Sequence, residues 1–170
     1  GDEVNESVPP DAHFEGSTLT LDSLSARQGK QGRVSGRGTV DFSGLTVKGY
    51  RFDVRARDFA ASDAGLYAAE FDGDFVITKG PQLRGVSLPQ VDGNVQLQRA
   101  TVLFDFSKQS ENDQLAATTQ PLYWTYRLDV VANDKLRWQP PDADIELSCD
   151  LAVEQTRDSL IIFGVMYALS

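Results

Sequence analysis

The stretch DADIELSCDLAVEQ, residues 142–155, alternates between apolar and polar side chains. The apolar members stand at the odd positions: Ala143, Ile145, Leu147, Cys149, Leu151 and Val153. The even positions are polar except for Ala152. A period of two residues predicts a β-strand with one face in water and one face away from it. Strands usually run to about 5–6 residues, so this longer apolar stripe must be covered, either by an opposing sheet or by a ligand.

Shorter versions of this alternation recur along the chain and indicate an all-β fold. They occupy residues 17–26, 33–42, 50–59, 69–80, 93–107 and 124–134, with a final apolar run at 160–170. No segment sustains the 3.6-residue period of an amphipathic helix, and the most helix-like one is 62–71. Roughly eight to ten strands with short connections predict a mostly antiparallel arrangement in sequence order.

Irregularities in the pattern make specific structural predictions. Within 93–107 the apolar side changes parity between Leu97 and Ala100. One extra residue would keep both halves on the same face, so we predict a bulge or sharp bend near Arg99–Ala100. Asn133–Asp134 predicts a turn between two strands, and residues 107–120 predict a polar loop.

The length and the two ends of the chain set the expected domain organisation. The 170 residues suffice for one domain with a core. Residues 1–16 lack alternation and contain Pro9–Pro10, which predicts a flexible lead-in before a single domain over 17–170. The run LIIFGVMYALS is apolar on both faces, and natural domains rarely leave such an edge strand unpaired. We therefore expect a fragment of a longer chain whose next strand covers that edge.

One apolar face per strand is compatible with three architectures: a two-sheet sandwich, a closed barrel, or a curved sheet folded over an open interior. The alternation alone does not choose among them. A carbohydrate-binding sandwich would display aromatic side chains on an exposed face, and Tyr123, Trp124, Tyr126 and Trp138 keep that alternative open.

The composition excludes several classes of partner. The formal net charge is −9, and no cluster of Lys and Arg is present for nucleic acid or for polybasic docking on an anionic bilayer. The single cysteine, Cys149, lies on an apolar stripe and is interpreted as a buried small hydrophobe. No apolar run approaches the roughly 18 residues of a membrane span. The acidic opening GDEVNESVPPDAH is not a secretory signal.

The residues offer no catalytic or metal centre, so we expect a protein that is not an enzyme and needs no cofactor. The one histidine, His13, lies in the lead-in, without a fixed partner for nucleophilic catalysis or a zinc site. The segment FDGDF resembles part of a calcium loop, but Asp72 and Asp74 fit the wet face of a strand better. Asp144 and Glu146 likewise fit an exposed acidic row rather than a glycosidase pair.

The order of these segments resembles a known family. GRVSGRGTVDF is followed by the basic YRFDVRARDF, then by PQVDGNVQLQRATVLFDF and the long polar loop. PLYWTYRLDVVANDKLRW, ADIELSCDLAV and SLIIFGVMYAL complete the series. The most characteristic pieces are V-x-G-x-V-x-L-x-R-A at 91–100 and L-R-W-x-x-P-D-A-D-I-E-L-x-x-D-L at 136–151. Over residues 17–170 the chain resembles the C-terminal domain of TamB-like proteins, within the AsmA-like group.

The resemblance implies a β-taco, an elongated all-β sheet curled into an open groove or barrel-like shape with an apolar interior. It implies anchoring in the inner membrane and a position in the periplasm of a diderm bacterium. It also implies two activities: phospholipid delivery to the outer membrane, and outer-membrane protein assembly together with an Omp85-type barrel.

We therefore predict a segment of an envelope-spanning protein whose groove shields the acyl chains of phospholipids, because exposing a chain to water costs about 0.8 kcal/mol per CH₂. The predicted groove residues are Phe71, Phe75, Ile77, Val95, Leu97, Val102, Phe104, Leu128, Val130, Ile145, Leu147 and Leu151. Packing of these residues in a closed core is the opposing interpretation.

The alternative function is an interaction module that pairs by an exposed strand edge. Its partner would be an Omp85-type barrel or a second copy of the chain. The predicted edge residues are Ile161, Phe163, Val165 and Tyr167.

Overall fold

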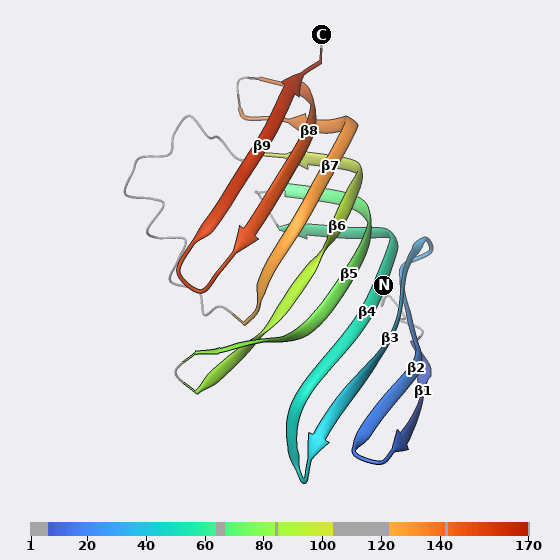
Figure 1. The fold of residues 1–170 in the computed structure, drawn as a ribbon. Coiled ribbons are helices and arrows are strands. Elements are labelled where there is room, and N and C mark those ends of the chain that lie inside the picture. Colours follow the sequence, from blue (N-terminus) through green and yellow to red (C-terminus); the bar gives the residue numbers. More distant parts are fainter. Residues whose placement is uncertain (1–6, 64–66, 84, 104–122, 142, 170) are drawn as a thin grey trace.

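The computed structural model describes residues 7–63, 67–83, 85–103, 123–141 and 143–169, and these form one nine-stranded sheet (Figure 1). The strands are β1 (Ser7–Glu15), β2 (Thr18–Gln28), β3 (Gly32–Ser43), β4 (Thr46–Asp63), β5 (Tyr67–Leu83), β6 (Val86–Val102), β7 (Thr125–Trp138), β8 (Ile145–Gln155) and β9 (Leu160–Ala168). The prediction of an all-β, mostly antiparallel fold is confirmed.

The strands are hydrogen-bonded in sequence order, from β1 at one edge to β9 at the other. Every neighbouring pair is antiparallel except β6 and β7, which run parallel. A parallel pair needs a long crossover connection, which accounts for the long polar segment between these two strands. The loop predicted at 107–120 falls in that connection and lies outside the described residues.

The described strands form a single layer. Their extensive contacts are all between neighbours in the sheet, and β1 does not pair with β9 to close a barrel. Of the three architectures, the curled open sheet is therefore the one observed (Figure 1). The described residues include no helix long and apolar enough to cross a membrane.

The lead-in expected over residues 1–16 differs from the structure. Ser7–Glu15 form β1, which pairs with β2 and shifts register between Val8 and Asp11. Proline lacks a backbone N–H, so Pro9 and Pro10 are tolerated in a strand that lies at the edge of a sheet.

The described residues of the helix-like stretch 62–71 also belong to strands, since β4 ends at Asp63 and β5 begins at Tyr67. Pairing of Phe71 with Phe59 and of Ala69 with Ala61 outweighs the local helix propensity of this segment.

The bulge predicted near Arg99–Ala100 is confirmed. Glu70 pairs with Arg99 and Phe71 pairs with Leu97, which leaves Gln98 as the extra residue on β6. This single insertion explains the change of apolar parity in the sequence, because it returns Ala100 to the face that carries Leu97.

Neighbouring strands carry bulges at the same level of the sheet. On β4, Arg57 and Asp58 lie opposite Asp72 of β5. On β7, residues 133–135 lie opposite Ser148 of β8. The turn predicted at Asn133–Asp134 is therefore wrong, since these residues bulge inside one continuous strand. Bulges bend a strand and increase its twist, and β4, β5 and β6 turn sharply where this line crosses them (Figure 1).

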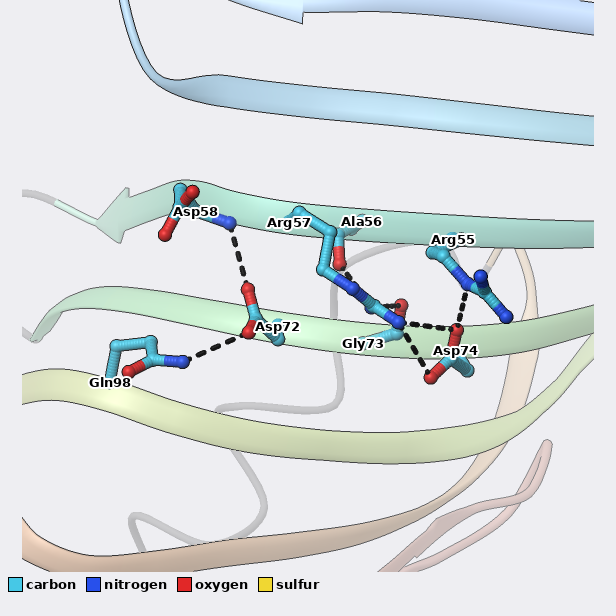
Figure 2. Close-up of polar contacts among 8 residues, drawn as sticks. All are labelled: Arg55, Ala56, Arg57, Asp58, Asp72, Gly73, Asp74 and Gln98. Carbon is cyan, nitrogen blue, oxygen red and sulfur yellow. Dashed lines mark hydrogen bonds and ion pairs between the residues drawn. The ribbon is translucent and has the colours of Figure 1, made fainter.

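A carboxylate links two of the bulges, as Figure 2 shows. Asp58 has a positive φ of 49°, and its backbone N–H donates to Asp72 Oδ1 at 2.8 Å. Gln98 Nε2 donates to Asp72 Oδ2 at 2.9 Å. Asp72 therefore connects the bulge of β4 to the bulge of β6 across β5, on the polar side of the sheet.

A second cluster on the same side surrounds Asp74 (Figure 2). Arg55 Nε donates to Asp74 Oδ1 at 2.8 Å, and Arg57 Nη2 donates to both carboxylate oxygens at 3.1 and 3.2 Å. Arg57 Nη1 also donates to the carbonyl of Gly73 at 3.0 Å. The hydrogen bond from Arg55, followed by those from Arg57, lowers the pKa of Asp74 below its ordinary value.

The most buried side chains lie at the bend. Ala100, Ala132, Leu136 and Cys149 form a cluster. Partly buried residues pack against it from both sides of the bulge line: Ala69, Leu97, Val102, Leu147 and Leu151. Because side chains from both arms of the bend meet here, the apolar side of the sheet lies on the inside of the bend.

Replacing Asp72 tests the link between the bulges. We expect Asp72→Ala to lower the free energy of unfolding by about 1–2 kcal/mol, because the Asp58 N–H and the Gln98 amide lose their acceptor. Urea unfolding measures the change. Asp129→Ala is the matched control, since Asp129 is an exposed strand aspartate without these bonds. Equal stability of the two variants would contradict the assignment.

The lowered pKa of Asp74 predicts a pH dependence. A carboxyl whose folded pKa is depressed adds stability above its unfolded pKa, and this contribution is lost as the pH falls through the folded value. We expect the stability difference between wild type and Asp74→Asn to be present at neutral pH and to shrink as the pH falls below the ordinary aspartate range. Unfolding at a series of pH values checks this, and a constant difference would refute it.

Candidate ligand-binding face

The register of the sheet places apolar side chains of adjacent strands directly beside one another. One row across the sheet is Val54, Phe75, Gly93, Leu128, Val153 and Ile162. The next row is Ala56, Gly73, Val95, Val130, Leu151 and Gly164. Beyond the bulges a third row is Ala61, Ala69, Ala100, Leu136, Leu147 and Ala168. We call the surface made by these rows the apolar face, and the opposite surface the polar face.

The predicted groove residues within the described chain all lie on the apolar face. On β5 and β6 they are Phe71, Phe75, Ile77, Val95, Leu97 and Val102, and on β7 and β8 they are Leu128, Val130, Ile145, Leu147 and Leu151. The remaining one, Phe104, lies outside the described residues. Four adjacent strands therefore bring the predicted set together on one surface.

The apolar face extends further than the sequence predicted. Phe52 pairs with Ile77, and Phe59 pairs with Phe71, so β4 contributes to the same surface. The alternation of residues 50–59 places Phe52 on the apolar side of its strand. It does not place Phe59 there, because the bulge at Arg57 and Asp58 reverses the parity between the two residues.

Glycines let aromatic rings lie flat on the apolar face. A Cβ atom at Gly73 or at Gly93 would overlap the ring of Phe75, so this ring covers the backbone of both glycines. The ring of Phe52 covers Gly38 in the same way. Because glycine has no side chain, each ring can approach the backbone of the neighbouring strand more closely than it could over any other residue.

No second layer covers this surface among the described residues. Val95, Leu128, Val130 and Leu151 are each only half-buried, and the described chain has no large side chain that is fully buried. A surface of this kind can make non-directional contact with an apolar ligand, but it presents no charge for chemistry or for directional recognition.

Two titratable groups at the apolar face have raised pKa values. Burial raises the pKa of the Cys149 thiol, which is 4% exposed. Burial, and to a smaller extent Tyr67, raises the pKa of Tyr126. Both shifts favour the neutral form, and the interpretation of Cys149 as a buried small hydrophobe is confirmed.

The polar side chains considered for chemistry are solvent-exposed or engaged with one another. His13 Nδ1 lies 2.9 Å from Asp22 Oδ2, and both residues are exposed. Asp144 Oδ2 accepts from Arg137 Nη2 at 2.9 Å. Within the described ranges, no three His, Cys, Asp or Glu residues gather in a metal-ligand arrangement.

Two recesses of about 380 and about 360 Å³ lie along the sheet. Polar side chains supply most of their lining, including Asp53 and Arg55 in the first and Thr125 and Glu154 in the second. Asp53, Arg55, Thr125 and Glu154 belong to the polar face, but the first recess also touches Val54 and Phe75 and the second touches Tyr126, so both recesses reach the edge of the apolar face.

β9 is an apolar edge strand. The predicted edge residues Ile161, Phe163, Val165 and Tyr167 pair with Glu154, Ala152, Asp150 and Ser148 respectively. Their side chains therefore lie on the polar face, opposite to the predicted groove set. They are 46–63% exposed, so the edge is uncovered within the described chain.

Comparison with known proteins identifies a family. No curated protein and no solved structure matches the chain. The family model described as the TamB C-terminal domain matches residues 22–168. This range includes β3 to β9 in full, together with residues 22–28 of β2, and hence the whole apolar face described above. The chain therefore belongs to the TamB C-terminal domain family.

Proposed function

We propose that the apolar face shields the acyl chains of phospholipids as they move between the two membranes of a diderm envelope. The observation that carries this proposal is an apolar surface on the inside of a bent sheet, which no opposing layer covers among the residues that the structure describes. Membership of the TamB family supports an envelope role as a non-enzymatic transport or assembly module.

The energetics suit a sliding ligand. An acyl chain of roughly fifteen methylenes loses about 12 kcal/mol of hydrophobic stabilisation when it is fully exposed to water. Contact with a half-buried row such as Val95, Val130 and Leu151 would recover part of that loss at each level of the sheet. Because the contacts are non-directional, neighbouring rows offer similar stabilisation, and no single row would trap the chain.

The lipid proposal is tested by photo-crosslinking from matched positions. A benzophenone amino acid at Leu128 on the apolar face should capture phospholipid in cells that produce the full-length protein. The same probe at Asp129, the next residue on the polar face, should not. Mass spectrometry of the purified adducts reads out the result.

A second pair of variants tests the face itself. Val130→Asp places a charge on the apolar face, and we expect it to reduce lipid capture at Leu128 at least fivefold, because an acyl chain would have to desolvate a carboxylate. Val131→Asp is the control, since Val131 is also half-buried but pairs with Gln96 and Asp150 on the polar face. Equal capture in both variants, with both folded by circular dichroism, would refute the proposal.

A second candidate function rests on β9. Two backbone hydrogen bonds show which residues of this segment bond toward β8. The Leu169 N–H donates to the Glu146 carbonyl, and the Thr156 N–H donates to the Ser159 carbonyl, so residues 159 and 169 belong to the set that faces β8. In an antiparallel pair only every second residue bonds to the partner strand. The N–H and C=O groups of Ile162 and Met166 therefore point away from β8, toward the free edge. We propose that this row adds to the edge of an Omp85-type outer-membrane barrel.

Proline scanning tests the edge. Ile162→Pro removes a donor on the free side, and we expect it to abolish protein crosslinks from a probe at Met166 while the sheet stays folded. Ile162→Thr keeps the N–H and should retain the crosslinks. Phe163→Pro would instead break the ladder with β8 and lower stability. Full crosslinking in Ile162→Pro would contradict strand addition at this edge.

A further inference from the structure

Exposed apolar side chains gather at one end of the sheet. We call it the tip end: it holds the β1–β2, β3–β4, β5–β6 and β8–β9 turns and the start of β7 (Figure 1). Outside β9 and residue 169, the exposed large hydrophobic residues of the described chain are Phe14, Leu24, Leu45, Val47, Tyr67, Val86, Leu103, Tyr123 and Trp124. All of these except Leu24, Tyr67 and Leu103 lie at the tip end, so apart from the edge strand β9 most of the exposed apolar side chains are at this end.

Leu45 is too exposed to stabilise the fold by burial. It occupies the two-residue turn between Ser43 and Thr46, beside Gly44 with its φ of 60°. Such turns favour Gly, Asn and Asp, yet this one displays a leucine that is 102% exposed. At the start of β7, Tyr123 and Trp124 are 76% and 57% exposed.

The apolar face runs onto the tip end. Phe14 pairs with Leu19, and its ring centroid lies 6.2 Å from that of Phe42. Phe42 in turn pairs with Val47 beside the β3–β4 turn. A ligand lying on the apolar face would therefore meet the exposed tips without crossing a polar barrier.

The kind of residue indicates the partner. The apolar side chains stand on separate turns, with polar residues between them. This spacing suits insertion into a fluid lipid layer better than packing against one flat protein surface. Trp and Tyr favour the boundary between lipid headgroups and acyl chains. A positively charged side chain lies beside the β3–β4 turn: Lys79 Nζ donates to the carbonyls of Val47 and Lys48 at 3.1 and 3.3 Å.

We propose that the tip end docks on the surface of a phospholipid bilayer, with the turns inserted to the level of the headgroups. Docking of this kind uses apolar tips rather than a polybasic face, and it is therefore compatible with the net charge of −9. It goes beyond the proposed lipid shielding and does not depend on it, although together they would let the apolar face open onto the membrane.

Vesicle flotation tests the docking. The chain is mixed with unilamellar vesicles of phosphatidylethanolamine and phosphatidylglycerol at 3:1, and the floated fraction is measured. We expect Leu45→Ser/Val86→Ser/Trp124→Ser to reduce flotation at least fivefold. The matched control is Leu24→Ser/Tyr67→Ser/Leu103→Ser, which removes the same number of exposed apolar side chains away from the tip end and should float like wild type.

The depth of Trp124 in the bilayer distinguishes insertion of the tip end from non-specific adhesion through another apolar surface. In Trp138→Phe, which leaves Trp124 as the only tryptophan, brominated acyl chains should quench the fluorescence. Val130→Asp should float normally, so a failure of lipid shielding would be distinguishable from a failure of docking. Wild type that does not float, equal losses in both triple variants, or unquenched Trp124 would each overturn the proposal.

Discussion

A sheet that is apolar on one side must remove that side from water, and the described part of this chain supplies no second layer with which to do so. Its solution is a line of bulges from β4 to β7 that bends the sheet over its own apolar side. Small residues such as Ala100 and Ala132 occupy the inside of the bend. Larger residues farther along each arm stay half-buried, so among the described residues the core closes at the bend and not along the arms.

The polar face holds that bend in place. Asp72 accepts hydrogen bonds from the bulges on both sides of β5, and Arg57 donates to the Gly73 carbonyl and to Asp74 immediately beside them. Exposed ion pairs are individually weak. These groups matter because they bond to backbone at the bulges, where the regular hydrogen bonds between strands are interrupted. Without them, an unsatisfied backbone N–H would favour another conformation.

The arrangement explains how a protein of this family can act without chemistry. The flat rings of Phe52 and Phe75, packed over glycines, give an even apolar surface with no titratable group that is poised to react. The strands present this surface along their length, and the tip end continues it through Phe42 and Val47. The proposed shielding, edge pairing and membrane docking use different parts of the same sheet, so each is testable alone.

The sequence by itself determined most of the strands, their apolar faces and a bulge near Arg99–Ala100, because a period of two and a change of parity are local properties of the chain. It also determined which side chains of β5 to β8 share a surface, since alternation fixes the face within each strand. It did not determine that Asn133–Asp134 bulges instead of turning, because the same polar residues suit both.

Only the tertiary structure decided that residues 7–15 form an edge strand, that β6 and β7 are parallel, and that the predicted edge set of β9 faces away from the apolar face. These outcomes depend on which strands meet and in what register. Register is set by contacts between residues far apart in the chain, and no single segment of the sequence contains both partners.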